Sequence, residues 1–354
     1  MDIINVLQEE LQVGRSQVEA AVKLIDEGNT IPFIARYRKE ATGSLNDEVL
    51  RTLDERLRYL RNLEDRKSQV IATIQEQEKL TPELEKQILD AETLVAVEDL
   101  YRPYRPKRRT RATIAKEKGL EPFAEWILSQ KADKPVEEEA ASYVDKEKGV
   151  ETAAAALSGA KDILAERISD NAQYRTYIRD LTMKEGILQS EAKDKTAQTV
   201  YEMYYHYEEP VSKTAGHRIL ALNRGENEKV LTVKITAPED KILSYLQKQA
   251  DTENNPYTSP VLREAAEDSY RRLIAPAIER EIRNELTERA EDGAIKVFGK
   301  NLEQLLMQPP IAGQVVLGWD PGFRTGCKLA VVDPTGKVLD TAVIYPTADS
   351  QNKI

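Results

Sequence analysis

The sequence predicts a mainly α fold that changes to β-strands after residue 312. Over most of the chain, apolar residues recur every three or four positions with charged residues between them, as in amphipathic helices. The segment "MQPPIAG" then brings two prolines and a glycine close together and indicates a domain boundary. Beyond it, "QVVLGWD", "CKLAVVD" and "KVLDTAVIY" are short, apolar and separated by turn residues, so they predict three strands.

Three short helices and a long one are expected before Pro82. The predicted ranges are Ile3–Leu11, Gln17–Glu27, Pro32–Lys39 and an amphipathic helix near Asp47–Lys79. Asn46 or Asp47 can cap the long helix, and Pro82 follows its end. The second and third helices are joined by the glycine-containing turn in "DEGNTIPF". They are compatible with a helix-turn-helix, in which the second helix enters a groove of DNA.

The middle of the chain combines further helices with one β-hairpin. Short helices are expected up to about Leu100, an irregular basic stretch over Tyr101–Lys118, and an Ala-rich helix in "ETAAAALSGAKDILAERISDN". Two more helical stretches carry the aromatic cluster "YEMYYHY", Tyr201–Tyr207. Alternating apolar residues on both sides of "NRGENE" predict a hairpin over 217–236. A long helix is then expected over 260–307, with a kink or restart at Pro276.

These elements predict three parts of the chain. The first, 1–195, is a helical domain with the helix-turn-helix-like element. The second, 196–312, is a central helical region with the hairpin and the long helix, and the third, 313–354, is rich in strands.

The composition narrows the classes of function. The net charge of −10 means that any nucleic-acid site must be a local basic patch on an acidic body. A single cysteine excludes disulfides within the chain and indicates a cytoplasmic protein. No stretch approaches the roughly 20 apolar residues that cross a bilayer, so we expect no membrane partner. The two histidines are too few for a histidine-based metal site, and we expect no cofactor and no small-molecule substrate.

The stretch from Tyr101 to Lys118 is the strongest departure from the acidic average, with eight basic residues and one acid. Guanidinium groups bind phosphate oxygens in a bidentate manner, and tyrosines can stack on bases. Pro103 and Pro106 are expected to hold the backbone extended. The candidate nucleic-acid contacts are Arg36, Arg38, Lys39, Tyr101, Arg102, Tyr104, Arg105, Lys107, Arg108, Arg109 and Arg111.

The residues of this candidate site can also be explained by structural roles that involve no nucleic acid. The arginines of the stretch can pair with acids of neighbouring helices, and tyrosines beside proline often pack as loop anchors. Cations at Arg36, Arg38 and Lys39 lie at the end of a predicted helix, where the helix dipole favours positive charge in any case. The sequence leaves both interpretations open.

Asp320 ends the first predicted strand of the third part, a position at which carboxylates often hold Mg²⁺. Two-metal chemistry needs several carboxylates converging on one place. Asp333 and Asp340, which follow, lie in or beside predicted turns. We therefore expect no catalytic residue and no metal ligand in this chain.

Three long segments resemble the bacterial Tex family, transcription accessory proteins that bind nucleic acid. These are "TIPFIARYRKEATGSLNDEVLRTLDERLRYLRNLEDRK", "VEDLYRPYRPKRRTRATIAKEKGLEPFAEWI" and "LGWDPGFRTGCKLAVVDPTGKVLDTAVIYP". The resemblance implies a helical N-terminal region with a helix-turn-helix-like element, and then a YqgF-type α/β domain with a ribonuclease H-like fold. It further implies helix-hairpin-helix elements and an OB-fold RNA-binding domain. The family is also similar to the core of a eukaryotic elongation factor that travels with RNA polymerase.

By this resemblance the YqgF-type domain begins at Gln314, and Asp320 falls where resolvase-like enzymes place their first metal ligand. We expect the chain to stop about three strands into that domain, as a fragment without the OB-fold domain. Its expected function is that of a non-enzymatic, nucleic-acid-binding scaffold in transcription, acting on RNA or DNA, with RNA polymerase as a candidate partner. The alternatives are a metal-dependent nuclease of the ribonuclease H-like or resolvase type in the full-length protein, and a helical protein-interaction scaffold for RNA polymerase.

Overall fold

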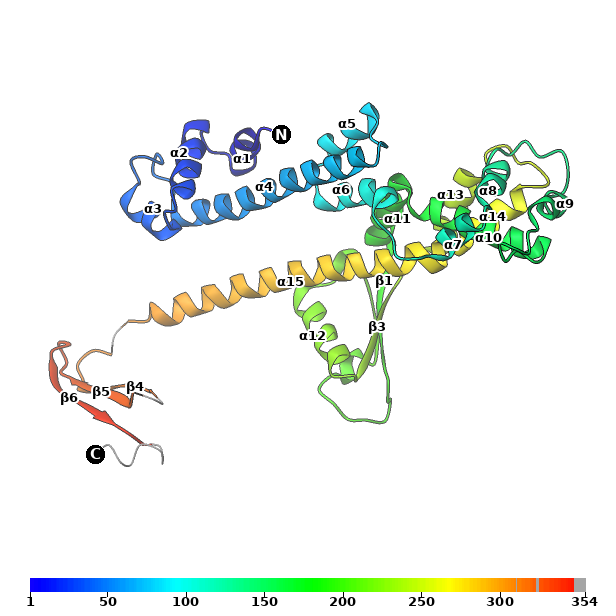
Figure 1. Cartoon of the computed structure of the whole chain (residues 1–354). Coiled ribbons are helices and arrows are strands. Elements are labelled where there is room, and N and C mark those ends of the chain that lie inside the picture. The colour runs from blue at the N-terminus through cyan, green and yellow to red at the C-terminus, as the bar shows by residue number, and fades with distance from the viewer. Residues whose placement is uncertain (310, 323–324, 347–354) are drawn as a thin grey trace. The chain divides into compact units, whose positions relative to one another are not determined.

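The computed structural model describes residues 1–309, 311–322 and 325–346 (Figure 1). It divides into two units, Met1–Glu288 and Arg289–Ile354, and each is described separately. The first unit consists mainly of helices with one small sheet, and the second holds the last part of a long helix and a second small sheet. The predicted mainly α class is confirmed.

The four predicted N-terminal helices are present. They are α1 (Ile3–Leu11), α2 (Arg15–Asp26), α3 (Ile31–Tyr37) and α4 (Asp47–Glu76). Asn46 caps α4, because its side chain accepts a hydrogen bond from the backbone N–H of Val49. Residues 27–30 form the turn between α2 and α3, as the predicted helix-turn-helix-like element requires.

Helix α4 supports two hydrophobic cores in succession. Its first half buries Leu50, Leu53 and Leu57 against residues of α1, α2 and α3, including Leu7 and Ile34. Its second half packs on the next two helices through a separate cluster of buried apolar residues. Figure 1 shows α1 to α3 along the first part of α4, and α5 and α6 along its last part. Burial on both halves explains why the predicted helix continues without a break over 30 residues.

The next group of helices surrounds the basic stretch. It comprises α5 (Pro82–Asp90), α6 (Leu94–Tyr101), the 3₁₀ turn η1 (Arg102–Tyr104), α7 (Arg111–Glu117), α8 (Glu121–Leu128), α9 (Val136–Ala140), the 3₁₀ turn η2 (Ala141–Tyr143), α10 (Ala153–Ser169) and α11 (Ala172–Glu185). The expectation that Tyr101–Lys118 is irregular throughout is wrong. Pro103 lies in η1, and Thr110 caps α7 by accepting a hydrogen bond from the backbone N–H of Thr113.

The predicted hairpin over 217–236 is also wrong. Its first arm is helix α12 (Gly216–Asn227), and only its second arm is a strand, β3 (Leu231–Thr236). The sheet that contains β3 has the antiparallel order β2-β1-β3, with β1 at Ile187–Ala192 and β2 at His206–Pro210. The aromatic cluster expected to be helical forms the 3₁₀ turn η3 (Glu202–Tyr204) and the start of β2, and a further 3₁₀ turn, η4 (Val211–Lys213), follows.

The long helical stretch is interrupted near Pro276, as predicted. It comprises α14 (Ser259–Asp268), the π-helical segment η5 (Ser269–Ile274) and α15 (Ala275–Leu306), and it follows α13 (Glu239–Ala250). Proline has no N–H to donate and its ring crowds the preceding turn, so α-helical hydrogen bonding cannot continue through it. The wider π-helical turn immediately before Pro276 accommodates this loss.

The first half of α15 closes the exposed edge of β3. Glu279 accepts a hydrogen bond from the backbone N–H of Ile235 at 2.8 Å, and Arg283 donates to the carbonyl of Val233 at 3.2 Å. Arg283 also pairs with Glu226 of α12 at 2.5 Å. These contacts satisfy backbone groups that an open sheet edge would leave unpaired.

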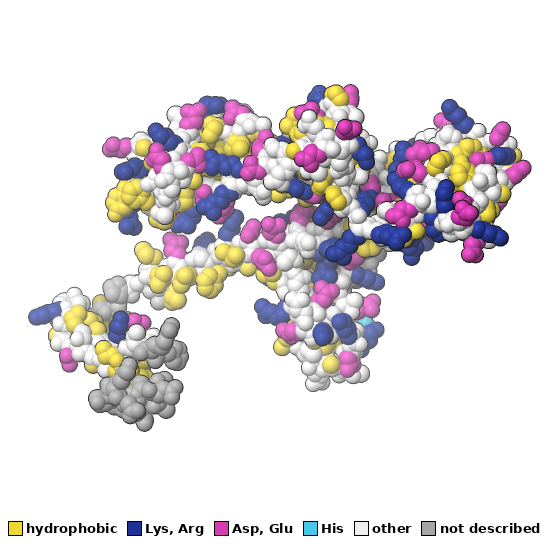
Figure 2. Space-filling model, in the orientation of Figure 1, with side chains coloured by type: hydrophobic (Ala, Val, Ile, Leu, Met, Phe, Trp, Pro, Cys, Tyr) yellow, Lys and Arg dark blue, Asp and Glu magenta, His cyan; other side chains and the backbone are white. Residues whose placement is uncertain are grey.

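The second unit contains the three predicted strands. They are β4 (Val316–Asp320), β5 (Cys327–Val332) and β6 (Val338–Ile344), paired antiparallel in the order β4-β5-β6. Residues 291–309, which include the last part of α15, are exposed, and Figure 2 shows hydrophobic side chains along that part of the helix. Residues 347–354 of the predicted third part lie outside the described residues. Across the described chain, every helix is too short or too polar to span a membrane.

Candidate nucleic-acid interface

The basic residues are centred on a loop, residues 105–110, between η1 and α7. We call it the basic loop. The helix before it ends in a core, because Tyr101 is buried in the same cluster as Leu63 and Val97 of α4 and α6. The carbonyl of Tyr104 accepts a hydrogen bond from the side-chain amide of Gln77 at 2.9 Å. The structure therefore uses Tyr101 as an anchor for the loop, while the ring of Tyr104 remains partly accessible.

Two cations of the stretch are held by acids at the end of α10. The ammonium group of Lys107 lies 3.1 Å from Glu166 and also contacts Asp170. The Nε atom of Arg102 lies 3.5 Å from the same Asp170 carboxylate. Burial raises the pKa of Asp170 above its ordinary value, although the hydrogen bond from Lys107 opposes this shift. These pairs hold η1 and the middle of the basic loop against the end of α10.

The other arginines of the stretch are exposed. Arg105, Arg108 and Arg111 are exposed and have no ion-pair partner among the described residues. Arg109 pairs with Glu117 at 2.9 Å, but both side chains are more than half exposed, and such surface pairs contribute little free energy. The structure thus divides the predicted contacts of this stretch into structural cations and available ones.

A buried ion-pair network lies behind the basic loop, and sequence reasoning did not find it. Arg175 and Arg179 of α11 both contact Asp99 of α6 and Glu281 of α15, at distances of 2.5 to 2.8 Å. Arg175 is fully buried. Burial disfavours the charged form of Arg179 and so acts to lower its pKa. The carboxylates of Asp99 and Glu281 outweigh this effect and raise the pKa of Arg179 above its ordinary value. The network joins three helices that are far apart in the sequence.

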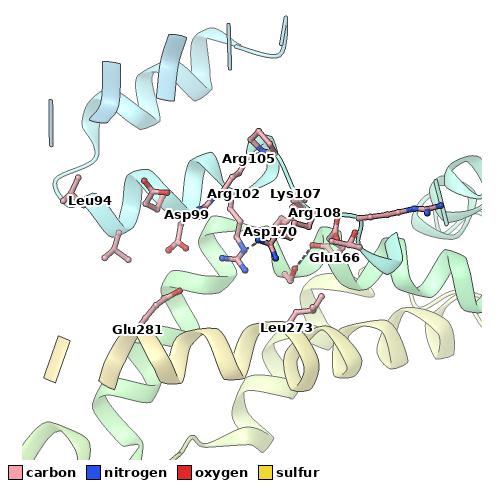
Figure 3. A pocket seen from close by; sticks show the side chains of 16 residues that line it. Leu94, Asp99, Arg102, Arg105, Lys107, Arg108, Glu166, Asp170, Leu273 and Glu281 are labelled. Atoms are coloured by element: carbon pink, nitrogen blue, oxygen red, sulfur yellow. Dashed lines mark hydrogen bonds and ion pairs between the residues drawn. The ribbon is translucent and has the colours of Figure 1, made fainter. Parts of the chain in front are cut away.

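A pocket of about 660 Å³ separates the basic loop from this network (Figure 3). Arg102, Lys107 and Arg108 lie on one wall, and Leu273 and Glu281 lie on the opposite wall. Burial and, next, the charge of Arg175 lower the pKa of Arg102. The guanidinium of Arg102 is thus close enough to that of Arg175 for the two positive charges to repel each other.

The second predicted basic cluster lies elsewhere in the first unit. Arg36, Arg38 and Lys39 are exposed at the end of α3, which packs on the first half of α4, whereas the basic loop follows α6 on the second half. Arg38 stacks over Phe33 at 5.1 Å, and Arg36 lies 6.0 Å from the ring of Tyr37. The two basic clusters therefore lie beside different halves of α4.

Asp320 is the last residue of β4, as predicted, and faces Lys328 across the sheet. Asp333 caps the turn before β6, where it accepts hydrogen bonds from the backbone N–H groups of Thr335 and Lys337. Within the ranges that the structure describes, no group of three or more histidine, cysteine or acidic residues is arranged to hold a metal ion.

Comparison with known proteins gives a consistent result. Residues 1–75 match the Tex-like protein N-terminal domain, 131–298 match the Tex central region-like family, and 314–354 match the Tex protein YqgF-like domain. The chain is 50% identical to the protein YdcI of Bacillus subtilis over 97% of this chain and 48% of that protein. It is 42% identical to the transcriptional accessory protein Tex of Neisseria gonorrhoeae over 98% of this chain and 46% of that protein.

A human protein named S1 RNA-binding domain-containing protein 1 is 33% identical over 97% of this chain and 36% of its own length. The chain thus spans about half the length, or less, of the curated relatives it matches. The domain boundaries predicted after residues 195 and 312 stay a prediction. The three Tex matches cover the N-terminal, central and C-terminal parts of the sequence in order. The chain therefore belongs to the Tex family.

Proposed function

We propose that this chain is a nucleic-acid-binding scaffold in transcription, and that the basic loop is its contact site. The observation that carries the proposal is the presence of exposed arginines without ion-pair partners among the described residues, Arg105 and Arg108 in the basic loop and Arg111 at the start of α7. Lys107 and Arg102 hold this segment against α10. The names of two relatives, one a transcriptional accessory protein and one an S1 RNA-binding domain-containing protein, support it.

The physical basis is phosphate binding by preorganised guanidinium groups. Each phosphate contact releases counterions, so binding must weaken with salt. Because Lys107 is already held by Glu166 and Asp170, the loop loses little further conformational freedom when it binds. The rest of the chain is acidic, and the net charge is −10. It should repel phosphate groups, so contact with nucleic acid is confined to the basic loop.

The test compares the chain with a variant that carries Arg105→Ala and Arg108→Ala. Single-stranded RNA and double-stranded DNA are titrated at several salt concentrations. The variant should bind more weakly, and the slope of log affinity against log salt for single strands should fall by about 1.4, since each lost contact contributes about 0.7. Arg167→Ala is the control, because Arg167 of α10 is also exposed but is paired with Glu125 of α8. Equal affinity and equal slopes for all three proteins would contradict the proposed contact site.

RNA polymerase is proposed as the protein partner. The support is the name of the gonococcal relative, which connects that protein with transcription. Purified core polymerase should bind the chain in a direct assay, with the affinity unchanged by nuclease treatment. A helical protein-interaction scaffold without a nucleic-acid role would bind polymerase but no RNA or DNA. Failure to bind polymerase under any of these conditions counts against the partnership.

We further propose that this part of the protein is not an enzyme. Asp320 is exposed at the end of β4 and, among the described residues, has no pair of carboxylates beside it. With Mg²⁺ present, the chain and Asp320→Asn should leave branched DNA and RNA equally intact. Mg²⁺-dependent cleavage that disappears in Asp320→Asn would establish the nuclease alternative instead.

A further inference from the structure

The pocket behind the basic loop has the size and the mixed walls of a ligand site. Its volume of about 660 Å³ falls in the range of pockets that hold one small ligand. Leu94, Val95 and Leu273 supply apolar surface, and Arg102, Arg105 and Arg108 supply cations. Figure 3 shows that these groups come from α6, the basic loop and the helices facing them.

The five carboxylates that line the pocket are all neutralised by a cation of the chain. Glu98 pairs with Arg66 at 2.6 Å, and Asp99 and Glu281 pair with Arg175 and Arg179. Glu166 pairs with Lys107, and Asp170 pairs with both Lys107 and Arg102. The lining holds five carboxylates and five cations, and three further cations from outside it, Arg66, Arg175 and Arg179, pair with these carboxylates. Arg105 and Arg108 have no ion-pair partner among the described residues, so their positive charge is not compensated.

One guanidinium group that lines this pocket, that of Arg102, and one behind its wall, that of Arg175, have unused hydrogen-bonding capacity. Arg102 is 35% exposed and has its only ion pair, among the described residues, through Nε to Asp170, which leaves its two terminal nitrogens available. Arg175, which holds the wall residues Asp99 and Glu281, is fully buried, and its Nη1 atom has no hydrogen-bond partner. A buried unpaired donor is costly, and an anion held by Arg102 would stabilise both charges.

We propose that this pocket binds the terminal phosphate of a nucleic-acid strand, with Arg102 as the main phosphate ligand. The inference rests on the proposed nucleic-acid binding and adds the part of the strand that the site recognises. A phosphate monoester carries nearly two negative charges near neutral pH, whereas an internal phosphodiester carries one. Two unpaired arginines beside Arg102 match the monoester, and the apolar wall can accommodate the sugar and base of the terminal nucleotide.

The test uses the full chain and three RNAs of one sequence, each with an internal fluorescent label. One carries a 5′-phosphate, one a 3′-phosphate, and one has hydroxyl groups at both ends. At one fixed salt concentration, at least one phosphorylated RNA should bind about tenfold more tightly than the hydroxyl RNA, because a bidentate charge-assisted contact is added. Equal affinity for all three RNAs would overturn the inference while leaving the proposed function intact. No binding of any of the three RNAs would also overturn the inference, and no binding of DNA in addition would contradict the proposed function itself.

Two substitutions of Arg102 test whether the preference for a terminal phosphate arises in this pocket, and Arg105→Ala serves for comparison. Arg102→Gln should remove the preference for the terminal phosphate. Because Arg102 also helps to fix the basic loop, the preference is measured in each variant as the ratio of the affinities for the phosphorylated and the hydroxyl RNA. Arg102→Lys keeps the charge beside Asp170 and therefore the fold, but it lacks the guanidinium fork, so the preference should decrease severalfold. Arg105→Ala should weaken binding of all three RNAs. A full preference retained in Arg102→Lys and Arg102→Gln would exclude this pocket.

A competition experiment identifies the source of the phosphate. Adenosine monophosphate should displace the phosphorylated RNA only at concentrations far above the dissociation constant of that RNA, because it makes no contact with the exposed basic loop. Displacement by the mononucleotide at concentrations equal to that dissociation constant would assign the pocket to a free nucleotide and overturn its assignment to a strand end.

Discussion

At the scale of single residues, Arg175 should be among the most costly side chains to remove. It is fully buried and contacts both Asp99 and Glu281. Without Arg175, the buried carboxylate of Asp99 and the partly buried one of Glu281 have less compensation. Breaking a buried ion pair in this way costs about 3–5 kcal/mol in other proteins. We expect Arg175→Ala to lower the free energy of unfolding by about 3 kcal/mol, because Arg179 still compensates part of the charge.

Urea unfolding followed by circular dichroism measures this change. Arg167→Ala is the matched control, since Arg167 lies in an exposed pair with Glu125 and should change the free energy by less than about 1 kcal/mol. Equal small effects of the two substitutions would show that the buried network does not stabilise the fold.

The same residues show how far the site could be predicted from the sequence. The basic stretch is visible as a local excess of charge, and Arg105 and Arg108 in it are exposed. Their contact with nucleic acid stays a prediction. The pairing of Lys107 with Asp170 is not visible, because 63 residues separate the two. Arg175 and Arg179 are spaced to lie on one helix face, but nothing in the sequence names Asp99 and Glu281 as their partners. Ion pairs between residues far apart in the sequence depend on how the helices pack. The periodicity of a single segment does not give that packing.

At the scale of helices and strands, the wrongly predicted hairpin over 217–236 shows which sequence patterns fit more than one structure. Ile219 and Leu222 are three residues apart and fit a helix as well as a strand. The alternation of Leu231, Val233 and Ile235 is a true strand signal, but the strand pairs with β1 some 40 residues earlier. The two strands that were not predicted, β1 and β2, are short and carry polar residues such as Glu191 and Glu208. Periodicity over long windows did succeed, as in α4 and α15.

Two glycines in helices should respond to alanine in opposite ways. A methyl group on Gly225 of α12 would lie 2.6 Å from Leu231, which is fully buried, and 3.2 Å from Tyr201. We expect Gly225→Ala to destabilise the first unit by about 1–3 kcal/mol through overpacking. Gly293 of α15 has open space, so Gly293→Ala should stabilise its helix by up to about 1 kcal/mol through helix propensity alone.

Urea unfolding tests Gly225→Ala, and hydrogen exchange over the last part of α15 tests Gly293→Ala. Tolerance of alanine at residue 225 would mean that α12 and β3 pack more loosely than the structure shows. Faster exchange in Gly293→Ala would contradict the open environment of that residue.

The strands of the second unit should exchange their amide hydrogens quickly. Most residues of β4 and β6 are exposed, and each of these strands pairs on one side only. Three-stranded sheets without a covered face are marginally stable, so exchange should be fast from Val315 to Tyr345 among the described residues. Within the sheet, β5 should be the slowest, because it pairs with both neighbours. Strong protection of β4 and β6 in exchange followed by mass spectrometry would contradict this expectation.

At the scale of the whole molecule, the burial of apolar residues is concentrated in the first unit. In the described chain, Cys327 is the only buried apolar residue after Ala290. The two core clusters on α4, the ion-pair network and the basic loop all precede residue 289. Stability and nucleic-acid binding should therefore be properties of the first unit.

A shortened chain that ends at Gln308 tests this separation. It keeps α15 but removes β4, β5 and β6, which bury little apolar surface. We expect its urea midpoint to agree with that of the longer chain, and its affinity for single-stranded RNA and its salt slope to be unchanged, because Arg105 and Arg108 keep their surroundings. A lower midpoint would mean that the strands support the first unit. A weaker affinity at an unchanged midpoint would place part of the nucleic-acid contact in the second unit, where Lys328 and Lys337 would be the next cations to replace.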